Sequence, residues 1–412
     1  MRTVGVILAV MMVARGGAPR DYDTYGGWRQ IRFKADGYFR VAERDGTWWL
    51  VTPLGNAFLS KGVNHISYTA DRAPSLGYSP YGRATAARYG SQEKWAEATA
   101  DRLRRWGFNT IGAWSGRAMW EQEIPYTVIL NLGVRAGADW RKGTMPDFFS
   151  AAFRDTIRSI CRKRCSPRRD DPYLLGYFTD NELAWATDWR RKKSLLESYL
   201  EMPEPSSGRR AAENLLAERG RTVESISRAD EDAFLALAAQ EYFRVCHEAI
   251  RAADPNHLVL GCRFAGYAPP PVLRAMKGRV DVVSFNNYDR QPPKMRLARI
   301  HEITSAPVMI TEFSFKAEDS GLPNTKGAGR PVATQQDRAD GFGRYVTALA
   351  ALPFCVGFHW FEYCDEPKEG RFDGENSNYG LVCITDEPWE ILTERMTAVN
   401  VRMEPLHARK PD

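Results

Sequence analysis

Two glutamates carry the chemistry that this sequence predicts, and each of them follows a short apolar run. Leu174–Leu183 reads LLGYFTDNEL and contains Glu182, and Pro307–Phe315 reads PVMITEFSF and contains Glu312. An apolar run that ends abruptly in acidic residues is typical of a buried parallel strand, and in barrels the carboxyl ends of such strands carry the active site. The two side chains are therefore expected to meet at the mouth of a barrel.

Hydrolysis of a glycosidic bond needs two such carboxyl groups. One protonates the leaving oxygen, and the other attacks the anomeric carbon or activates a water molecule. Asn181, directly before Glu182, can hydrogen-bond a sugar hydroxyl beside the reacting centre. The pattern favours glycoside cleavage with Glu182 and Glu312 as the catalytic pair.

Eight strand signals alternate with helical patterns and predict an α/β fold, a (β/α)8 TIM barrel. The expected strands are Ala57–Ile66, Phe108–Trp114, Tyr126–Leu132, Leu174–Leu183, His257–Arg263, Val280–Tyr288, Pro307–Phe315 and Cys355–Glu362. The fourth and seventh strands lie on opposite sides of such a barrel, so their glutamates face each other across its mouth.

Segments outside this alternation are assigned separately. Residues 19–56 form an N-terminal extension with a β-hairpin cap, because Asp45-Gly46 is a turn signal between alternating runs. The barrel covers residues 57–402, with a helical insertion at 185–232 after the fourth strand, and 403–412 form a tail. Residues 1–18 resemble a short signal peptide, which predicts a secreted or periplasmic protein and otherwise a cytoplasmic one.

Composition narrows the class of protein. The chain has 412 residues, 43% of them hydrophobic and 26% charged, which fits one large globular domain. The net charge of +6 is modest, the basic residues are scattered, and there is no phosphate-binding glycine motif, so a nucleic-acid partner is not expected. No apolar segment is long enough for membrane insertion. The cysteines and histidines lack ligand spacing, so neither a metal site nor any cofactor is expected.

In these two glutamate motifs the sequence resembles the clan A glycoside hydrolases, which are retaining (β/α)8 enzymes. Their acid/base follows an asparagine at the end of strand four, as Glu182 follows Asn181, and their nucleophile ends strand seven, as Glu312 does. The resemblance further implies that Tyr288 hydrogen-bonds the nucleophile and that Trp360 forms the floor of the sugar subsite. The motif GYFTDNEL and the late loop DGENSNYGLV at 373–382 are most similar to bacterial β-agarases and β-galactosidase-like enzymes.

Further side chains near the expected strand ends are assigned to substrate binding. These residues are Asn64, His65, Trp185, Arg263, Asn287 and Glu362. Two of them have an equal alternative: Trp185 could be core, and Arg263 could keep a glutamate ionised instead of contacting substrate. The basic run Trp189–Lys193 is expected to be a solvated helix face, with contact to a sulfated polysaccharide as the alternative.

The leading hypothesis is a retaining glycoside hydrolase that cleaves a β-linked, galactose-containing poly- or oligosaccharide by double displacement. One alternative is a catalytically silent barrel that binds polysaccharide. A sugar-phosphate enzyme ranks lowest, since the glycine-containing segment 321–329 has no recognisable phosphate pattern.

Overall fold

The computed structural model describes residues 21–409 and contains one barrel of parallel strands. The hydrogen-bonded strand order is β10-β11-β12-β13-β5-β6-β7-β8-β9. The strands are β5 Ser60–Val63, β6 Thr110–Ile111, β7 Tyr126–Ile129, β8 Leu174–Phe178, β9 Leu258–Val259, β10 Phe264–Ala265, β11 Val283–Asn286, β12 Val308–Phe313 and β13 Cys355–Trp360.

The nine strands occupy the eight strand positions of the barrel, because β9 and β10 are two parts of one segment. β9 pairs with β8, whereas β10 pairs with β11. The Val259 carbonyl also accepts a hydrogen bond from the Val282 amide at 3.4 Å, so this one segment contacts both of its neighbours. The sheet therefore closes through residues 258–265, and the predicted TIM-barrel fold is confirmed.

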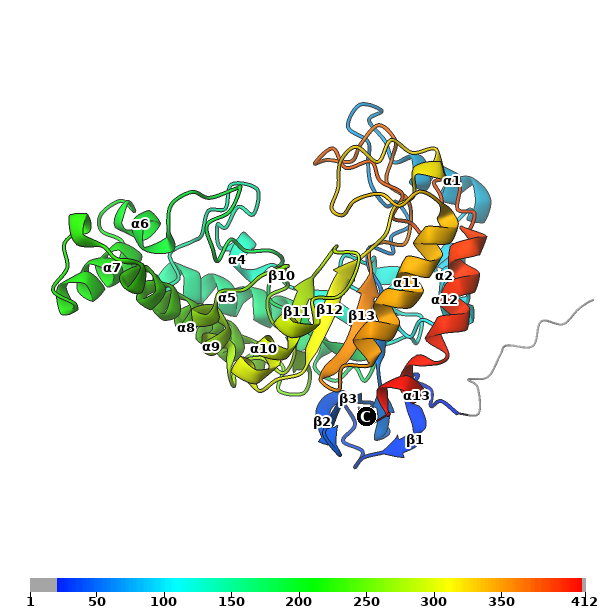
Figure 1. Ribbon diagram of the computed structural model, residues 1–412, viewed down its shortest axis with the longest axis horizontal. Helices are drawn as coiled ribbons and strands as arrows, with labels where there is room; N and C mark the ends of the chain where they lie inside the picture. Colours follow the sequence, from blue (N-terminus) through cyan, green and yellow to red (C-terminus); the bar gives the residue numbers. More distant parts are fainter. Residues whose placement is uncertain (1–20, 410–412) are drawn as a thin grey trace, which may run out of the picture.

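Helices cover the outside of the barrel, as the alternation of patterns predicts (Figure 1). Several begin at a serine or threonine whose side chain accepts from the first turn, for example Ser91, Ser150 and Thr334. The helices are α1 Pro80–Tyr89, α2 Gln92–Arg105, α3 Arg117–Trp120, α4 Leu132–Arg135, α5 Ala151–Arg164, α6 Leu195–Leu200, α7 Ser207–Glu218, α8 Arg228–Ala253, α9 Pro270–Met276, α10 Lys294–Thr304, α11 Gln335–Ala350, α12 Glu390–Asn400 and α13 Met403–His407.

A small antiparallel sheet closes the amino-terminal end of the barrel, below the strands in Figure 1. Its strands are β1 Trp28–Arg32, β2 Arg40–Arg44, β3 Thr47–Val51 and β4 Asn56–Phe58, in the order β1-β4-β3-β2. The expected cap is thus present, but it is a four-stranded sheet that includes the predicted hairpin β2–β3. The first barrel strand is correspondingly shorter than expected, since residues 56–58 belong to the cap.

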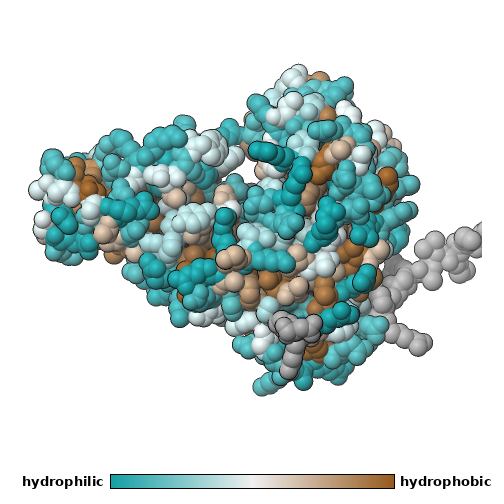
Figure 2. Space-filling model, viewed as in Figure 1, coloured by the Kyte–Doolittle hydropathy of each residue, from teal (hydrophilic) through white to brown (hydrophobic). Residues whose placement is uncertain are grey.

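The insertion after β8 is helical, as expected, and contains α6, α7 and the start of α8. It projects to one side of the barrel, and the loops after β5, β12 and β13 rise on the other side (Figure 1). The space-filling view shows a mainly hydrophilic face that is hollowed between these two parts (Figure 2).

The next features concern the two ends of the chain and the character of its helices. The predicted signal peptide at 1–18 lies outside the described residues. Residues 403–407 of the expected tail form α13, and His407 in that helix is buried with its ring nitrogens against the carbonyls of Trp48 and Ala350. Within residues 21–409 no helix has the length and apolar character needed to cross a membrane.

We predict that the cap stabilises the barrel through apolar contacts at its lower end. Phe58 is fully buried in a cluster with Leu258, Met309 and Val356, which come from the lower parts of the barrel. Replacing Phe58 with Ala should lower the free energy of unfolding by about 3–5 kcal/mol, because it leaves a cavity among these side chains. The measurement is urea denaturation followed by circular dichroism.

Leu54→Ala is the matched control, since Leu54 lies in the same cap but is 54% exposed. It should change the free energy of unfolding by less than about 0.5 kcal/mol. Equal effects of the two substitutions would show that the cap does not support the barrel.

Candidate active site

Glu182 is held at the barrel mouth by an irregular backbone just beyond β8. The strand ends at Phe178, and Asn181 then forms an isolated parallel bridge with Arg263. The Glu182 amide donates to the Arg263 carbonyl at 2.8 Å, and Glu182 has φ of 52°. A positive φ is uncommon for a residue other than glycine and is often found at functional sites.

Glu312 lies within β12 on the opposite side of the mouth and is 6% exposed. Its carboxylate has two charge-stabilising partners. The Tyr288 hydroxyl donates to Oε2 at 2.8 Å, and Arg263 Nη2 forms an ion pair with Oε1 at 2.8 Å. The expected contact between Tyr288 and the carboxylate is therefore present.

One continuous chain of polar contacts joins the two glutamates. Arg263, which pairs with Glu312, also donates from Nη1 to Asn181 Oδ1 at 3.1 Å. The same Asn181 oxygen accepts from Asn286 Nδ2 at 3.1 Å, and Asn286 Nδ2 lies 3.0 Å from Glu182 Oε1. Of the two alternatives for Arg263, its contacts are those of a partner to a glutamate, because its side chain is fully buried.

The two carboxyl groups have different charged and polar neighbours. Burial, followed by the like charge of Glu312, raises the pKa of Glu182. Glu312 has the cation of Arg263 beside it, whereas Glu182 accepts only from a neutral amide. Burial and the nearby like charge thus favour the protonated form of Glu182, while an ion pair with Arg263 holds Glu312.

Asp180 has a supporting role beside the site. Its carboxylate accepts from the Gly133 amide at 2.7 Å, from the Val134 amide at 3.2 Å and from the Tyr242 hydroxyl at 2.7 Å. Burial raises the pKa of Asp180 to about 6. These contacts tie β8 to the loop after β7, as expected of a structural aspartate.

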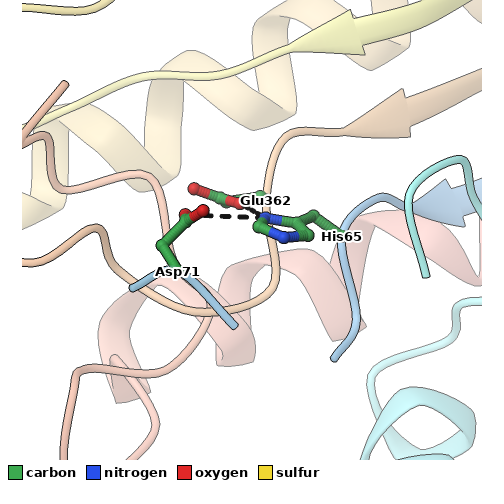
Figure 3. Close-up of side chains that lie close together, drawn as sticks. All are labelled: His65, Asp71 and Glu362. Carbon is green, nitrogen blue, oxygen red and sulfur yellow. Dashed lines mark hydrogen bonds and ion pairs between the residues drawn. The ribbon is translucent and has the colours of Figure 1, made fainter. Parts of the chain in front are cut away.

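A second cluster of titratable groups lies after β5 and β13. His65 Nδ1 contacts a carboxylate oxygen of Glu362 and lies 3.7 Å from Asp71 Oδ2 (Figure 3). Burial lowers the pKa of His65, but the charges of Asp71 and Glu362 outweigh it and raise that pKa to about 9. Burial also raises the pKa of Glu362.

The ligand atoms of His65, Asp71 and Glu362 lie within 4.8 Å of one another, which is close enough to hold a metal ion. Arg371 Nη1 lies 3.9 Å from both carboxylates and 3.3 Å from Glu366 Oε1. Its positive charge opposes a cation at this position, so the cluster is better described as an ion-pair network.

The assignment of Trp360 to the sugar subsite is corrected by the structure. Its ring is fully buried, packs against Phe313 and Phe342, and donates from Nε1 to the Tyr379 carbonyl at 2.8 Å. Side chains alternate across a strand, and His359 occupies the barrel interior with Nε2 at 2.8 Å from Ser60 Oγ. Trp360 therefore points outward, toward α11.

Two other assignments to substrate binding are also corrected. Trp185 is 3% exposed and stacks on Phe148 and Phe243, so of its two alternatives the structure supports core packing. Asn64 is fully buried, and its amide donates to the carbonyls of Thr311 and Trp360 at 2.9 and 3.1 Å. Trp185 thus packs in the outer layer against α8, and Asn64 ties the end of β5 to β12 and β13.

From the sequence, Asn287 is predicted to bind substrate, but in the structure its neighbour Asn286 makes the contact with Glu182. The Asn287 side chain bonds Tyr345 and Asp289 instead, at 2.7 and 3.0 Å. The run FNNY offers two adjacent asparagines on opposite faces, and only the strand register decides between them.

Two aromatic residues near the mouth were also missed. Phe361 lies 6.3 Å from the Tyr288 ring, and Trp114 is 37% exposed with the Arg263 guanidinium 6.0 Å from its ring. Trp114 ends one predicted strand and Phe361 is the next-to-last residue of another, and this position was the available signal.

A pocket of about 970 Å³ opens beside Glu182. Its wall includes Asn286, Asn287 and Tyr288 from the end of β11. The mouth of the barrel is therefore large enough for a sugar unit, and oxygen and nitrogen donors face it.

Comparisons with known proteins agree with this fold. The chain is 28% identical to β-agarase B of Vibrio sp. (strain JT0107) over 485 aligned positions, which cover 94% of this chain and 50% of the relative. It is 30% identical to β-agarase A of the same organism, covering 88% of this chain and 45% of the relative. The chain thus spans about half the length of the curated relatives that it matches.

Among solved structures, an agarase superposes with a TM-score of 0.83 at 28% identity, covering 94% of this chain and 67% of the other. No family model matches the chain. A barrel of this kind, together with the likeness to agarases in sequence and fold, is typical of the clan A glycoside hydrolases. Within this class, the comparisons confirm that the chain is agarase-like in sequence and in fold.

We predict that the pKa of Glu182 depends on the charge of Glu312. Replacing Glu312 with Gln removes the like charge while retaining an oxygen for Tyr288 and Arg263, so the pKa of Glu182 should fall toward the ordinary glutamate value of about 4.3. Carbon-13 NMR of labelled carboxyl groups measures this change, with the Glu182 signal assigned by its loss in Glu182→Gln.

Asp180 provides an internal control in an experiment with labelled aspartate. Its pKa is raised by burial and modified by hydrogen bonds, with no contribution from Glu312, so its titration should not move. An unchanged Glu182 pKa in the variant would mean that the two carboxyl groups do not interact.

Proposed function

We propose that the chain is a retaining glycoside hydrolase that cleaves β-linked galactan of the agar type. The observation that carries this proposal is the polar chain from Glu312 through Arg263, Asn181 and Asn286 to Glu182. It fixes two carboxyl groups at one barrel mouth, one paired with a buried guanidinium group and the other with a neutral amide. The similarity to proteins named β-agarase supports the class of substrate.

In the proposed mechanism Glu312 is the nucleophile. Its carboxylate oxygen attacks the anomeric carbon and forms a covalent glycosyl-enzyme as the bond to the leaving oxygen breaks. The Tyr288 hydroxyl and the Arg263 guanidinium hold the carboxylate in place and stabilise its charge before attack.

Glu182 is proposed as the acid and then the base. Its proton passes to the leaving oxygen in the first step, and in the second step it removes a proton from the water that attacks the intermediate. Its raised pKa suits the first role, because a protonated carboxyl group must be present when substrate binds.

Binding contacts to the sugar are proposed for Glu362 and His65, which lie after β13 and β5. Glu362 Oε1 is buried without a hydrogen-bond partner among the described residues, and Phe361 beside it lies near the Tyr288 ring. A sugar hydroxyl could supply the missing donor to this oxygen.

We expect the wild-type chain to hydrolyse agar-type galactan oligosaccharides in a panel that also contains porphyran, mannan and aryl β-glycosides. Glu312→Gln should lower kcat by at least about a thousandfold, because the amide cannot act as the nucleophile. Binding of the oligosaccharide, measured by calorimetry, should remain close to that of the wild type.

Glu318→Gln is the control for this experiment, since Glu318 follows the same strand but is exposed. Its kcat should equal that of the wild type. A wild-type chain that binds galactan and hydrolyses nothing in the panel would instead support the silent polysaccharide-binding barrel.

Stereochemistry tests the division of roles. In Glu182→Gln, azide should restore part of the rate on an activated aryl β-glycoside and give a β-glycosyl azide, because it attacks the intermediate on Glu312 from the opposite face. In Glu312→Gly, azide should attack the substrate directly and give an α-glycosyl azide. Proton NMR distinguishes the two products, and a reversed outcome would exchange the two roles.

A further inference from the structure

The pocket beside Glu182 has an unusual concentration of arginine on its wall. Arg290 follows β11, Arg296 lies on α10, and Arg330 lies in the long loop before α11, so three separate segments bring the three guanidinium groups together. All three side chains are exposed. The Tyr267 ring, which is 54% exposed, belongs to the same wall.

These arginines retain most of their hydrogen-bonding capacity. Arg290 Nη2 donates to the Pro331 carbonyl at 3.3 Å, and Arg296 Nη1 donates to the Gly266 carbonyl. These contacts hold two guanidinium groups on the wall but use only one of the five N–H donors of each. Within residues 21–409, none of the three forms an ion pair with a carboxylate.

The charge of the pocket is therefore positive. The carboxyl groups on its wall are those of Asp289 and Glu182. Asp289 Oδ2 accepts from the Asn287 amide at 3.0 Å, and Glu182 must be protonated when substrate arrives. Three guanidinium groups thus face one carboxylate, and the excess charge lies within reach of a bound ligand.

The position of Glu182 indicates which part of a substrate would enter. In the proposed reaction the acid protonates the leaving oxygen, and the nucleophile attacks the sugar on the other side of the bond. Because Glu182 lies on the pocket wall and only Tyr288, the partner of Glu312, reaches it from the nucleophile, we assign the pocket to the leaving group. Glu312 is not part of the pocket wall.

We propose that this pocket is a leaving-group subsite for an anionic galactan unit, one that carries a sulfate ester or a carboxylate. The arginines bind the anionic group, since the guanidinium fork matches such oxygen pairs, and Tyr267 offers an apolar face to the sugar ring. This inference rests on the proposed glycosidase function and deepens it by naming the charge of the substrate.

The basic run 189–193, the alternative site for a sulfated polysaccharide, is less suited to this role. Arg190 pairs with Asp188 at 2.6 Å and donates to the Glu182 carbonyl at 2.7 Å, while Arg191 is buried and donates to the Ala184 carbonyl at 2.7 Å. These two arginines hold the loop after β8 in place.

Three matched substrates test the proposal: a β-galactan oligosaccharide with a sulfate ester on the leaving-group sugar, the same oligosaccharide with a carboxylate there, and the neutral parent. The variant is Arg290→Gln/Arg296→Gln/Arg330→Gln. Its control is Arg274→Gln/Lys277→Gln/Arg299→Gln, which removes three exposed positive charges from α9, its C-terminal end and α10, outside the pocket wall.

We expect the pocket variant to lose about tenfold in kcat/KM on the anionic substrate, because each exposed ion pair contributes a factor of roughly two to three. It should lose less than about twofold on the neutral parent, and the control should keep the wild-type preference. The wild-type preference should also weaken at about 0.5 M salt, since salt screens exposed charges. An effect on only the sulfated or only the carboxylated substrate identifies the anion that the subsite accepts.

Equal losses on anionic and neutral substrates, or no preference in the wild type, would overturn the subsite while leaving the glycosidase function intact. If the wild type cleaves none of the three substrates, the glycosidase function fails, and calorimetry of the wild type and the pocket variant with the sulfated oligosaccharide decides the subsite. Tighter binding by the wild type would support it, and equal binding would overturn it.

Discussion

The site depends on one buried cation. Arg263 is fully buried, and its guanidinium pairs with Glu312 at 2.8 Å while it donates to Asn181 and to the Thr311 carbonyl. A buried ion pair is costly to assemble and still more costly to break, because removal of one partner leaves an uncompensated charge. The barrel therefore has to bring β8, β12 and the segment after β9 into register before this arginine can be buried. Correct closure of the barrel and assembly of the site are, in this sense, the same event.

The barrel is closed by the same segment that carries Arg263. Residues 258–265 pair with β8 at one end and with β11 at the other, and Arg263 lies between the two pairings. The Arg263 carbonyl also accepts a hydrogen bond from the Glu182 amide. The position of the proposed acid is therefore set by the same segment that carries the cation. The cap below and the helices outside supply apolar burial. They hold the barrel closed.

Around this centre, charge is distributed unevenly. Carboxylates gather about Arg371 after β13, whereas arginines gather beside Glu182 after β11. A substrate that spans the mouth would meet an acidic network on one side and a basic pocket on the other. Such asymmetry can fix the direction in which a polysaccharide chain lies, because only one orientation places an anionic unit near the arginines.

The fold class and the position of Glu182, Glu312 and Tyr288 at strand ends were predictable from the sequence, because short apolar runs that end in polar residues mark strand ends wherever they occur. The structural role of Asp180 was predictable in the same way. Only the tertiary structure shows on which face of its strand each side chain lies. Trp360 and His359 are adjacent, as are Asn286 and Asn287, and a strand turns neighbours to opposite faces. Which neighbour faces the mouth depends on register against the next strand, and register is set by contacts between segments far apart in the chain. The same reason explains why the arginine pocket was not foreseen, since Arg290, Arg296 and Arg330 share no pattern in the sequence and meet only when the barrel closes.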